Sequence, residues 1–380
     1  MSAPEVTARL ASAVGSFPAA EWDALTEGAN PFVSHAFLTA LEDSGSVGGT
    51  SGWDPAPIVI VGADGKLAGA LPAYLKRHSR GEYVFDHAWA DAWHRAGGRY
   101  YPKLQISPPF TPATGPRILT RDAALAAPLL RAAELVCSQH GLSSAHATFI
   151  APDEQPLFDA ARWLPRSDIQ FHFHNRGYAS FDDFLASLSS AKRKNLRKER
   201  AAAQDGVDIR ALSGADLKAE HWDAFWRFYQ DTGARKWGHP YLTREAFTLF
   251  GERMAEQVLL VLAFSDGRAV AGALNFIGRD ALYGRYWGAT VDKPFLHFEL
   301  CYYQAIDAAI ARGLSRVEAG AQGSHKLARG YEPVQTRSAH YIAHEGFRAA
   351  VADFLEQERA GVAAEQVWLG ERTPFRKPDN

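Results

Sequence analysis

The sequence has few cysteines, no long apolar run and no excess of charge of one sign. Only Cys137 and Cys301 occur among 380 residues, and their spacing matches neither a zinc motif nor a disulfide framework, which predicts a reducing compartment. No stretch reaches the roughly 18 apolar residues of a transmembrane helix, and the first ten residues lack the apolar core of a signal peptide. We therefore expect a cytoplasmic protein with no integral membrane segment and no metal centre.

The charge balance excludes a general polyanion binder. Lys and Arg together number 41, and Asp and Glu number 43, so a basic site must be local and DNA binding is not expected. Aromatic residues gather in short clusters, of the kind that line cores or ligand clefts. These clusters are Tyr100–Tyr101, Trp222–Tyr229 and Tyr302–Tyr303.

A similar order of elements occurs twice along the chain, whose length favours two domains. Each half has helical periodicity followed by a hairpin signal, Asp64-Gly65 in the first half and Asp266-Gly267 in the second. A further strand, a helix over 122–141 or 296–312, and another strand then follow. This order predicts an α/β (α+β) fold in which each domain holds a mixed, mostly antiparallel sheet flanked by helices.

The domain boundaries follow from the same pattern. We predict an N-terminal domain over 1–160, a second domain over 165–345, and a C-terminal helix with a tail over 346–380.

Three motifs resemble the FemAB group of peptidoglycan aminoacyltransferases, whose fold duplicates that of the GNAT acyltransferases. They are SLSSAKRKNLRKERAAAQDGV (187–207), LYGRYWGA (282–289) with LHFELCYYQAIDAAIARG (296–313), and EAGAQGSHKLARGYEP (318–333). The resemblance extends over nearly the whole chain. It implies tandem GNAT-like domains of a bacterial acyltransferase, which transfers an acyl or aminoacyl group to an amine of a cell-wall precursor or small molecule.

One stretch departs from the GNAT pattern. In acetyl-CoA-dependent GNAT enzymes, a glycine-rich turn at a helix N-terminus holds the pyrophosphate through backbone amides. The equivalent stretch here, 289–297, has no glycine and contains Asp292. The departure counts against CoA binding at this turn. It fits the aminoacyl-tRNA donor that the resemblance to the FemAB group implies, with no bound cofactor required. Acyl-CoA-dependent N-acyl transfer is the second hypothesis, and a non-catalytic module that binds peptidoglycan precursor or RNA is the third.

The first candidate site is a basic helix. Six of the nine residues from 192 to 200 are Lys or Arg, with Arg193 and Arg197 on one face and Lys194 and Lys198 on another. Like charges at this spacing repel each other mildly. Either a bound anion, such as a substrate phosphate, offsets this repulsion, or the surface is simply exposed to solvent. Charge alone leaves both open, and the resemblance favours substrate binding by Arg193, Lys194 and Arg197.

The second candidate site is the strand over 282–289. Strand alternation places Arg285 and Trp287 on one face and Tyr286, between two glycines, on the other. Glycines leave room for a substrate near the backbone, so Tyr286 is a candidate catalytic residue and Arg285 a candidate substrate ligand. An aromatic core layer with an arginine at its rim is the alternative.

The third candidate is Glu299, in the first turn of the following helix. A glutamate there is either stabilised by the helix dipole, which is the simpler interpretation, or is a buried carboxylate that binds or deprotonates an amine.

The fourth candidate is the loop after the strand over 315–319. Ligands gather at the carboxyl ends of strands in α/β sheets, and a capped turn would explain the glycines of this loop but not its polar side chains. No Ser-His-Asp or reactive-cysteine motif is present, so we expect direct attack in a ternary complex. We assign catalysis to Glu318, His325 and Lys326, and substrate binding to Gln322 and Arg329.

Overall fold

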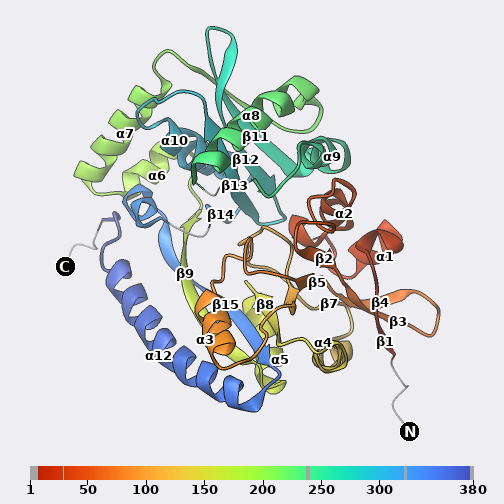
Figure 1. Ribbon diagram of the computed structural model, residues 1–380. Helices are drawn as coiled ribbons and strands as arrows, with labels where there is room; N and C mark the ends of the chain where they lie inside the picture. The colour runs from red at the N-terminus through yellow and green to blue at the C-terminus, as the bar shows by residue number, and fades with distance from the viewer. Residues whose placement is uncertain (1–6, 29, 237–239, 321–322, 377–380) are drawn as a thin grey trace. The chain divides into compact units, whose positions relative to one another are not determined.

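The computed structural model describes residues 7–28, 30–236, 240–320 and 323–376 (Figure 1). The chain divides into two compact units. Unit 1 comprises Met1–Asp168 and Gln335–Ala364, and unit 2 comprises Ile169–Val334 and Glu365–Asn380. The chain leaves unit 1 inside strand β9 (Leu164–His174) and returns to it inside strand β15 (Glu332–Ile342).

Unit 1 holds two groups of strands. One has the order β1-β3-β4-β7 and is antiparallel, and the other has the order β15-β8-β6-β5-β2. In the second group β6 and β8 are parallel and the other pairs are antiparallel. The strands are β1 (Ala8–Leu10), β2 (Trp53–Pro55), β3 (Ile58–Val61), β4 (Leu67–Leu71), β5 (Ala73–Lys76), β6 (Lys103–Ile106), β7 (Leu119–Thr120) and β8 (Ser144–Thr148).

The helices of unit 1 pack apolar side chains on these strands. The helix that joins the parallel strands β6 and β8 buries Leu129, Leu130 and Ala133 in a core with Ile58 and Leu104. The helices are α1 (Ala19–Ala24), α2 (His35–Asp43), α3 (His87–Arg95), α4 (Ala126–His140), α5 (Gln155–Ala160) and most of α12 (Glu345–Gly370).

Unit 2 holds one sheet with the strand order β10-β11-β12-β13-β14-β9. Adjacent strands of this sheet are antiparallel, except that β13 and β14 are parallel. Asp266 and Gly267, which join β11 to β12, both have positive φ (48° and 74°), as the predicted hairpin turn requires. The strands are β10 (Asp208–Leu212), β11 (Val258–Ser265), β12 (Arg268–Ile277), β13 (Ala281–Ala289) and β14 (Arg316–Glu318).

Helices cover both faces of this sheet. Phe225 and Phe228 of α8 lie against Gly272 of β12 and Gly288 of β13, while Leu300 and Ile306 belong to the core cluster on the other face. The elements are α6 (Phe181–Ser187), α7 (Ser190–Gln204), α8 (Ala219–Lys236), α9 (Arg244–Met254), α10 (Leu296–Phe298), the π-helix η7 (Glu299–Tyr303), α11 (Gln304–Ala311) and the 3-10 helix η8 (Ser324–Arg329).

The observed architecture confirms the predicted α/β (α+β) fold class. In each unit an antiparallel hairpin is followed by a strand, a helix and a parallel strand. The division differs from the predicted domains on the C-terminal side, because Ser338–Ile342 pairs with β8 and Gln335–Ala364 belongs to unit 1. Within the described residues, no helix is long and apolar enough to cross a membrane.

Candidate active site

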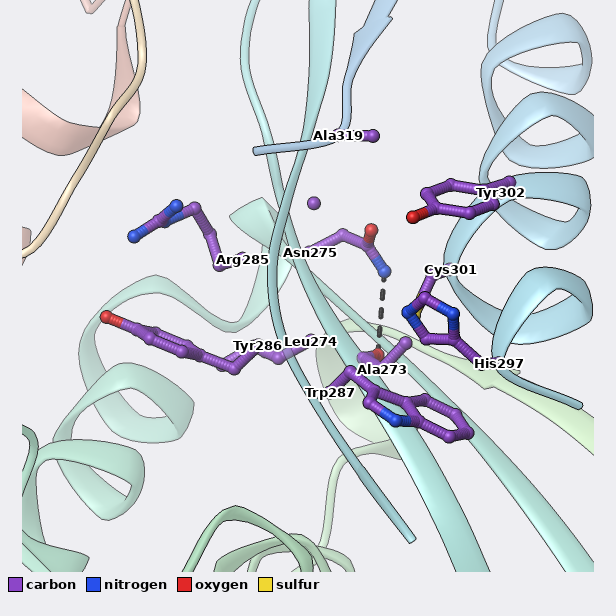
Figure 2. Close-up of a pocket in the computed structure, with 11 residues that line it drawn as sticks. Ala273, Leu274, Asn275, Arg285, Tyr286, Trp287, His297, Cys301, Tyr302 and Ala319 are labelled. Carbon is purple, nitrogen blue, oxygen red and sulfur yellow. Dashed lines mark hydrogen bonds between the residues drawn. The ribbon is translucent and has the colours of Figure 1, made fainter. Parts of the chain in front are cut away.

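A pocket lies where two parallel strands of unit 2 separate. Strands β13 and β14 pair only over Ala281–Tyr283 and Arg316–Glu318, although β13 continues to Ala289. The volume of the pocket at this divergence is about 110 Å³. We call it the β13–β14 pocket; its wall includes Asn275, Gly284, Trp287, His297, Cys301 and Tyr302 (Figure 2).

A β-bulge in β13 decides which side chains share a face. Asn275 of β12 is opposite Gly284 and Leu274 is opposite Tyr286, so Arg285 is the extra residue. The bulge shifts the side-chain alternation by one residue. Trp287 therefore lies on the face of Gly284, and Tyr286 lies on the other.

The face assignment predicted from regular alternation therefore holds for Arg285 and is wrong from Tyr286 onward. Figure 2 shows Trp287 directed toward His297, and Arg285 and Tyr286 directed to the other side of the sheet. The Trp287 and His297 ring centroids are 5.1 Å apart. The Tyr286 ring instead lies 5.1 Å from that of Tyr229 on α8, with the Arg285 guanidinium carbon 5.1 Å from the centre of the Tyr286 ring. Arg285 and Tyr286 are still among the residues that line the pocket.

A π-helical turn aims two adjacent tyrosines in different directions. Residues Glu299–Tyr303 are π-helical, a distortion that is frequent at functional sites. The hydroxyl of Tyr302 lies 2.9 Å from Nε2 of His325, and the Tyr302 ring lines the β13–β14 pocket. The hydroxyl of Tyr303 instead donates to the Glu199 carboxylate at 2.6 Å.

The loop after β14 brings His325 and Lys326 to this region. His325 is exposed, and its ring centroid is 5.8 Å from that of Tyr302. Lys326 is 2% exposed, and its Nζ donates to the Gly320 carbonyl at 3.0 Å. Burial lowers the pKa of Lys326 to about 8, so this amine can gain or lose a proton near neutral pH.

Glu318 is buried at the end of β14. Its Oε1 accepts from Arg316 Nε at 2.9 Å, and its Oε2 lies 3.9 Å from Nε2 of His172. Burial lowers the pKa of His172, which favours the neutral ring. The carboxylate of Glu318 is therefore balanced by Arg316.

Glu299 faces the basic helix. It is fully buried, and its Oε1 accepts from Gln204 at 2.9 Å and Gln304 at 2.7 Å. Nε of Arg200 lies 3.4 Å from the same oxygen. These contacts place Glu299 among residues of α7 and α11, whereas its neighbours Cys301 and Tyr302 line the pocket. Gln322, predicted to bind substrate, lies outside the described residues.

Helix α7 carries the predicted basic surface. Arg197 pairs with Asp182 at 2.9 Å, and Arg200 pairs with Asp307 and Glu299. Within the part of the chain that the structure describes, Arg193, Lys194 and Lys198 form no ion pair. These three side chains leave a positive surface available for an anion.

Arg329 contacts the backbone of the His325 loop, the Phe298 ring and Glu199. Its guanidinium carbon lies 3.4 Å from the centre of the Phe298 ring. One nitrogen donates to the His325 carbonyl at 2.9 Å and another to the Glu199 carboxylate at 3.0 Å. The predicted substrate ligand is thus held by protein groups on three sides.

A wider recess adjoins the pocket. Trp287 and His297 border both, and the recess has a volume of about 830 Å³. Its remaining wall includes the 289–293 turn, with Asp292 and Lys293, and Asp231 of α8. Lys293 Nζ donates to the Asp205 carbonyl at 2.7 Å. We call this space the wide recess.

Solved structures with the same fold share little sequence with the chain. The crystal structure of FemX matches with a TM-score of 0.54 and 12% identity, covering 88% of this chain and 98% of that one. A conserved protein of unknown function from Bacteroides thetaiotaomicron matches with a TM-score of 0.52 and 11% identity, covering 88% and 99%. The C-terminal domain of a proposed lysylphosphatidylglycerol synthetase from Agrobacterium fabrum matches with a TM-score of 0.50 and 11% identity, covering 79% and 87%.

Sequence comparison gives the family. No protein with a curated functional description matches the chain. The sequence profile of the FemAB-like family, described by peptidoglycan biosynthesis and recognition, matches residues 13–377. Because that match covers nearly the whole chain, the protein belongs to the FemAB-like family.

Proposed function

We propose that the protein transfers an aminoacyl or acyl group to an amine of a cell-wall precursor, and that the acyl group reacts in the β13–β14 pocket. The observation that carries the proposal is the pocket itself, which lies where the pairing of β13 with β14 ends. The edge of β13 there can offer backbone hydrogen-bonding groups to a substrate carbonyl. The family description and the name of the Agrobacterium protein with the same fold support this reaction class.

The reaction is a direct attack. The amine nitrogen of the acceptor forms the amide bond to the acyl carbon, and the ester C–O bond of the donor breaks. The amine loses a proton, and the departing ribose oxygen of an aminoacyl-tRNA gains one. Because both reactants are held in one pocket in the geometry for attack, the reaction needs no covalent enzyme intermediate.

One pair of groups and one lysine can take part in the reaction. The Tyr302 hydroxyl and His325 Nε2 form a relay that begins in the pocket wall and ends at an exposed imidazole. The buried Lys326 has a pKa lowered to about 8, which suits a group that exchanges protons near neutral pH. In this proposal His325 takes the proton of the amine, and Lys326 stabilises the developing negative charge.

The proposed donor is an aminoacyl-tRNA. The unpaired cations Arg193, Lys194 and Lys198 suit a phosphate backbone. The 289–293 turn, by contrast, places Asp292 where CoA-dependent relatives would need backbone amides for a pyrophosphate. Acyl-CoA stays the second candidate donor, because the wide recess shares Trp287 and His297 with the pocket and its volume of about 830 Å³ is large enough for a carrier group.

An assay with purified protein tests the proposal. The protein is incubated with a UDP-linked muropeptide and either aminoacyl-tRNAs or acetyl-CoA. The mass of the muropeptide is then measured by mass spectrometry. We expect a mass gain of one aminoacyl residue, with a much lower rate for His325→Ala and a similar melting temperature. If the muropeptide binds but no donor is consumed, the protein is a binding module and the proposal fails.

A further inference from the structure

We infer that Glu299 is a positioning residue, which holds the π-helical turn Glu299–Tyr303 in the conformation that places Tyr302 in the wall of the β13–β14 pocket. The inference rests on the proposed function, in which the Tyr302 hydroxyl and His325 form the proton relay. Glu299 is fully buried and is not among the described residues that line the pocket. It therefore acts on the reaction through Tyr302 and not through contact with a substrate.

The π-helical turn contains one residue more than an α-helical turn would. Its backbone N–H···O bond runs from Gln304 to the carbonyl of Glu299, five residues earlier. If the turn changed to α-helical bonding, the side chains on one side of it would rotate by about 100° relative to those on the other. Tyr302 would then move with respect to His297, whose ring centroid is 5.4 Å from that of Tyr302. The conformation of this turn thus decides where the pocket wall lies.

The side chains of Glu299 and Gln304 form a second bond across the same turn. Nε2 of Gln304 donates to Oε1 of Glu299 at 2.7 Å. In an α-helix, side chains five residues apart point in directions that differ by about 140°, and side chains three or four apart are the ones that meet. The bond between positions 299 and 304 therefore favours the π-helical turn over an α-helix. It stabilises the conformation in which Tyr302 lines the pocket.

Helix α7 supplies the other contacts of this carboxylate. Oε1 of Glu299 also accepts from Gln204 Nε2 at 2.9 Å, and Nε of Arg200 lies 3.4 Å from the same oxygen. Arg200 is itself held by an ion pair with Asp307, and its guanidinium carbon lies 4.2 Å from the centre of the Phe181 ring. The turn is thus tied to the same helix whose basic surface is proposed to bind the donor phosphates.

The second oxygen of Glu299 argues against a purely stabilising role. Oε2 is buried and, among the described residues, has no hydrogen-bond partner. A buried polar atom without a partner lowers stability, and a buried ionic group is often no more stabilising than an apolar residue of similar size. The carboxylate is therefore explained by the conformation that it holds, rather than by the stability that it adds.

Two substitutions at position 299 separate positioning from proton transfer. Glu299→Gln keeps an oxygen that can accept from Gln204 and Gln304, whereas Glu299→Leu removes every acceptor. With aminoacyl-tRNA and the UDP-linked muropeptide, we expect Glu299→Gln to retain most of the wild-type kcat and Glu299→Leu to lose about 10- to 100-fold. KM for the donor should stay nearly unchanged in both, because the cations of α7 remain. A Glu299→Gln variant as slow as Glu299→Leu would show that the carboxylate itself reacts, and a normal kcat in Glu299→Leu would show that it is dispensable; either result overturns the inference.

Gln304→Ala tests the bond across the turn without altering a charge. It removes the donor to Glu299 and leaves the contacts of Glu299 with α7, so we expect kcat to fall by about 10- to 100-fold, as in Glu299→Leu. Gln155→Ala is the matched control, because Gln155 on α5 of unit 1 also donates to a carboxylate, that of Asp159, at 2.8 Å. The control should leave kcat unchanged. A wild-type kcat in Gln304→Ala would contradict the role of this bond in holding the pocket wall.

Crystal structures of the variants give a measurement that needs no turnover. We expect the π-helical turn in the wild type and in Glu299→Gln, and α-helical bonding with a displaced Tyr302 ring in Glu299→Leu and Gln304→Ala. A π-helical turn that is unchanged in both of the latter variants would overturn the inference. Absence of transfer by the wild type from every donor would instead overturn the proposed function, and the structures would still show whether Glu299 holds the turn.

Discussion

Glu199 and Arg329 form an ion pair, with 3.0 Å between the carboxylate and the guanidinium. The pair joins the basic helix α7 to the loop that carries His325, because Arg329 also donates to the His325 carbonyl. Glu199 is the single acidic residue of α7. Its charge is directed to the His325 loop and to Tyr303, so Arg193, Lys194 and Lys198 stay available for phosphates.

Glu199→Gln should therefore slow the reaction through its effect on His325. The glutamine keeps a hydrogen-bond acceptor for Tyr303 but loses the charge that holds Arg329. A small displacement of a catalytic group costs about 10- to 100-fold in rate, so we expect kcat to fall by that factor with KM for the donor nearly unchanged. Steady-state kinetics and the pH profile of kcat measure the effect, and Glu199→Asp should restore part of the rate. An unchanged kcat together with a lower melting temperature would give Glu199 a structural role alone.

The unpaired surface of α7 should bind phosphates. Arg193→Ala combined with Lys194→Ala removes two positive charges that form no ion pair, so the affinity for aminoacyl-tRNA should fall. The slope of log affinity against log salt concentration should decrease in magnitude by about 1.5. The measurement is tRNA binding at several salt concentrations. Arg210→Ala, which removes an exposed arginine paired with Asp208 on β10, is the control. An unchanged salt slope in the double variant would show that the helix is merely solvated.

Much of this architecture follows from local sequence signals. The Asp266-Gly267 turn has the positive φ values that its residues favour. Gly141 ends α4 in the left-handed conformation with φ 62°, and Thr243 caps α9 by accepting from the Ala246 amide at 3.3 Å. Each signal depends on a few neighbouring residues, so it survives in any tertiary context.

The features missed by sequence reasoning depend on partners far away along the chain. The bulge at Arg285 exists only in the pairing of β12 with β13, so alternation within β13 could not predict that Tyr286 and Trp287 exchange faces. Asn275 is a single buried amide in an apolar strand, which is a detectable signal, but only its place opposite Gly284 makes it a pocket residue. The predicted end of the second domain, at residue 345, differs from the observed division because β15 pairs with β8 of unit 1, which is also a distant partner along the chain.

The pH dependence of turnover should reveal Lys326. Burial lowers its pKa from 10.5 to about 8. In the proposed role the ammonium form stabilises negative charge, so kcat should fall as pH rises through about 8, and Lys326→Arg should move this fall to higher pH. Lys326→Met should lose turnover without losing stability, since it removes a buried charge and leaves an apolar chain of similar length. The rate between pH 6 and 10 and the melting temperature are measured for all three proteins. A fall in kcat near pH 8 that persists in Lys326→Met would assign the titration to another group.

Acid should destabilise unit 1 through His146. Its Nδ1 lies 2.7 Å from Nδ1 of His340 and its Nε2 lies 2.7 Å from the Ser144 hydroxyl; burial lowers the pKa of His146 from 6.5 to about 3. Between these two pH values the unfolded chain binds a proton that the folded chain does not, so the free energy of unfolding falls as the pH falls. The loss is about 1.4 kcal/mol per pH unit below 6.5 for each such group, or roughly 2 kcal/mol from pH 6.5 to 5. Urea unfolding at these two pH values should show this loss in the wild type and a loss smaller by about 2 kcal/mol in His146→Asn, whose amide keeps polar contacts but does not titrate. If both proteins lose the same free energy, His146 is protonated in the folded state and the buried histidine pair is not the source of acid sensitivity.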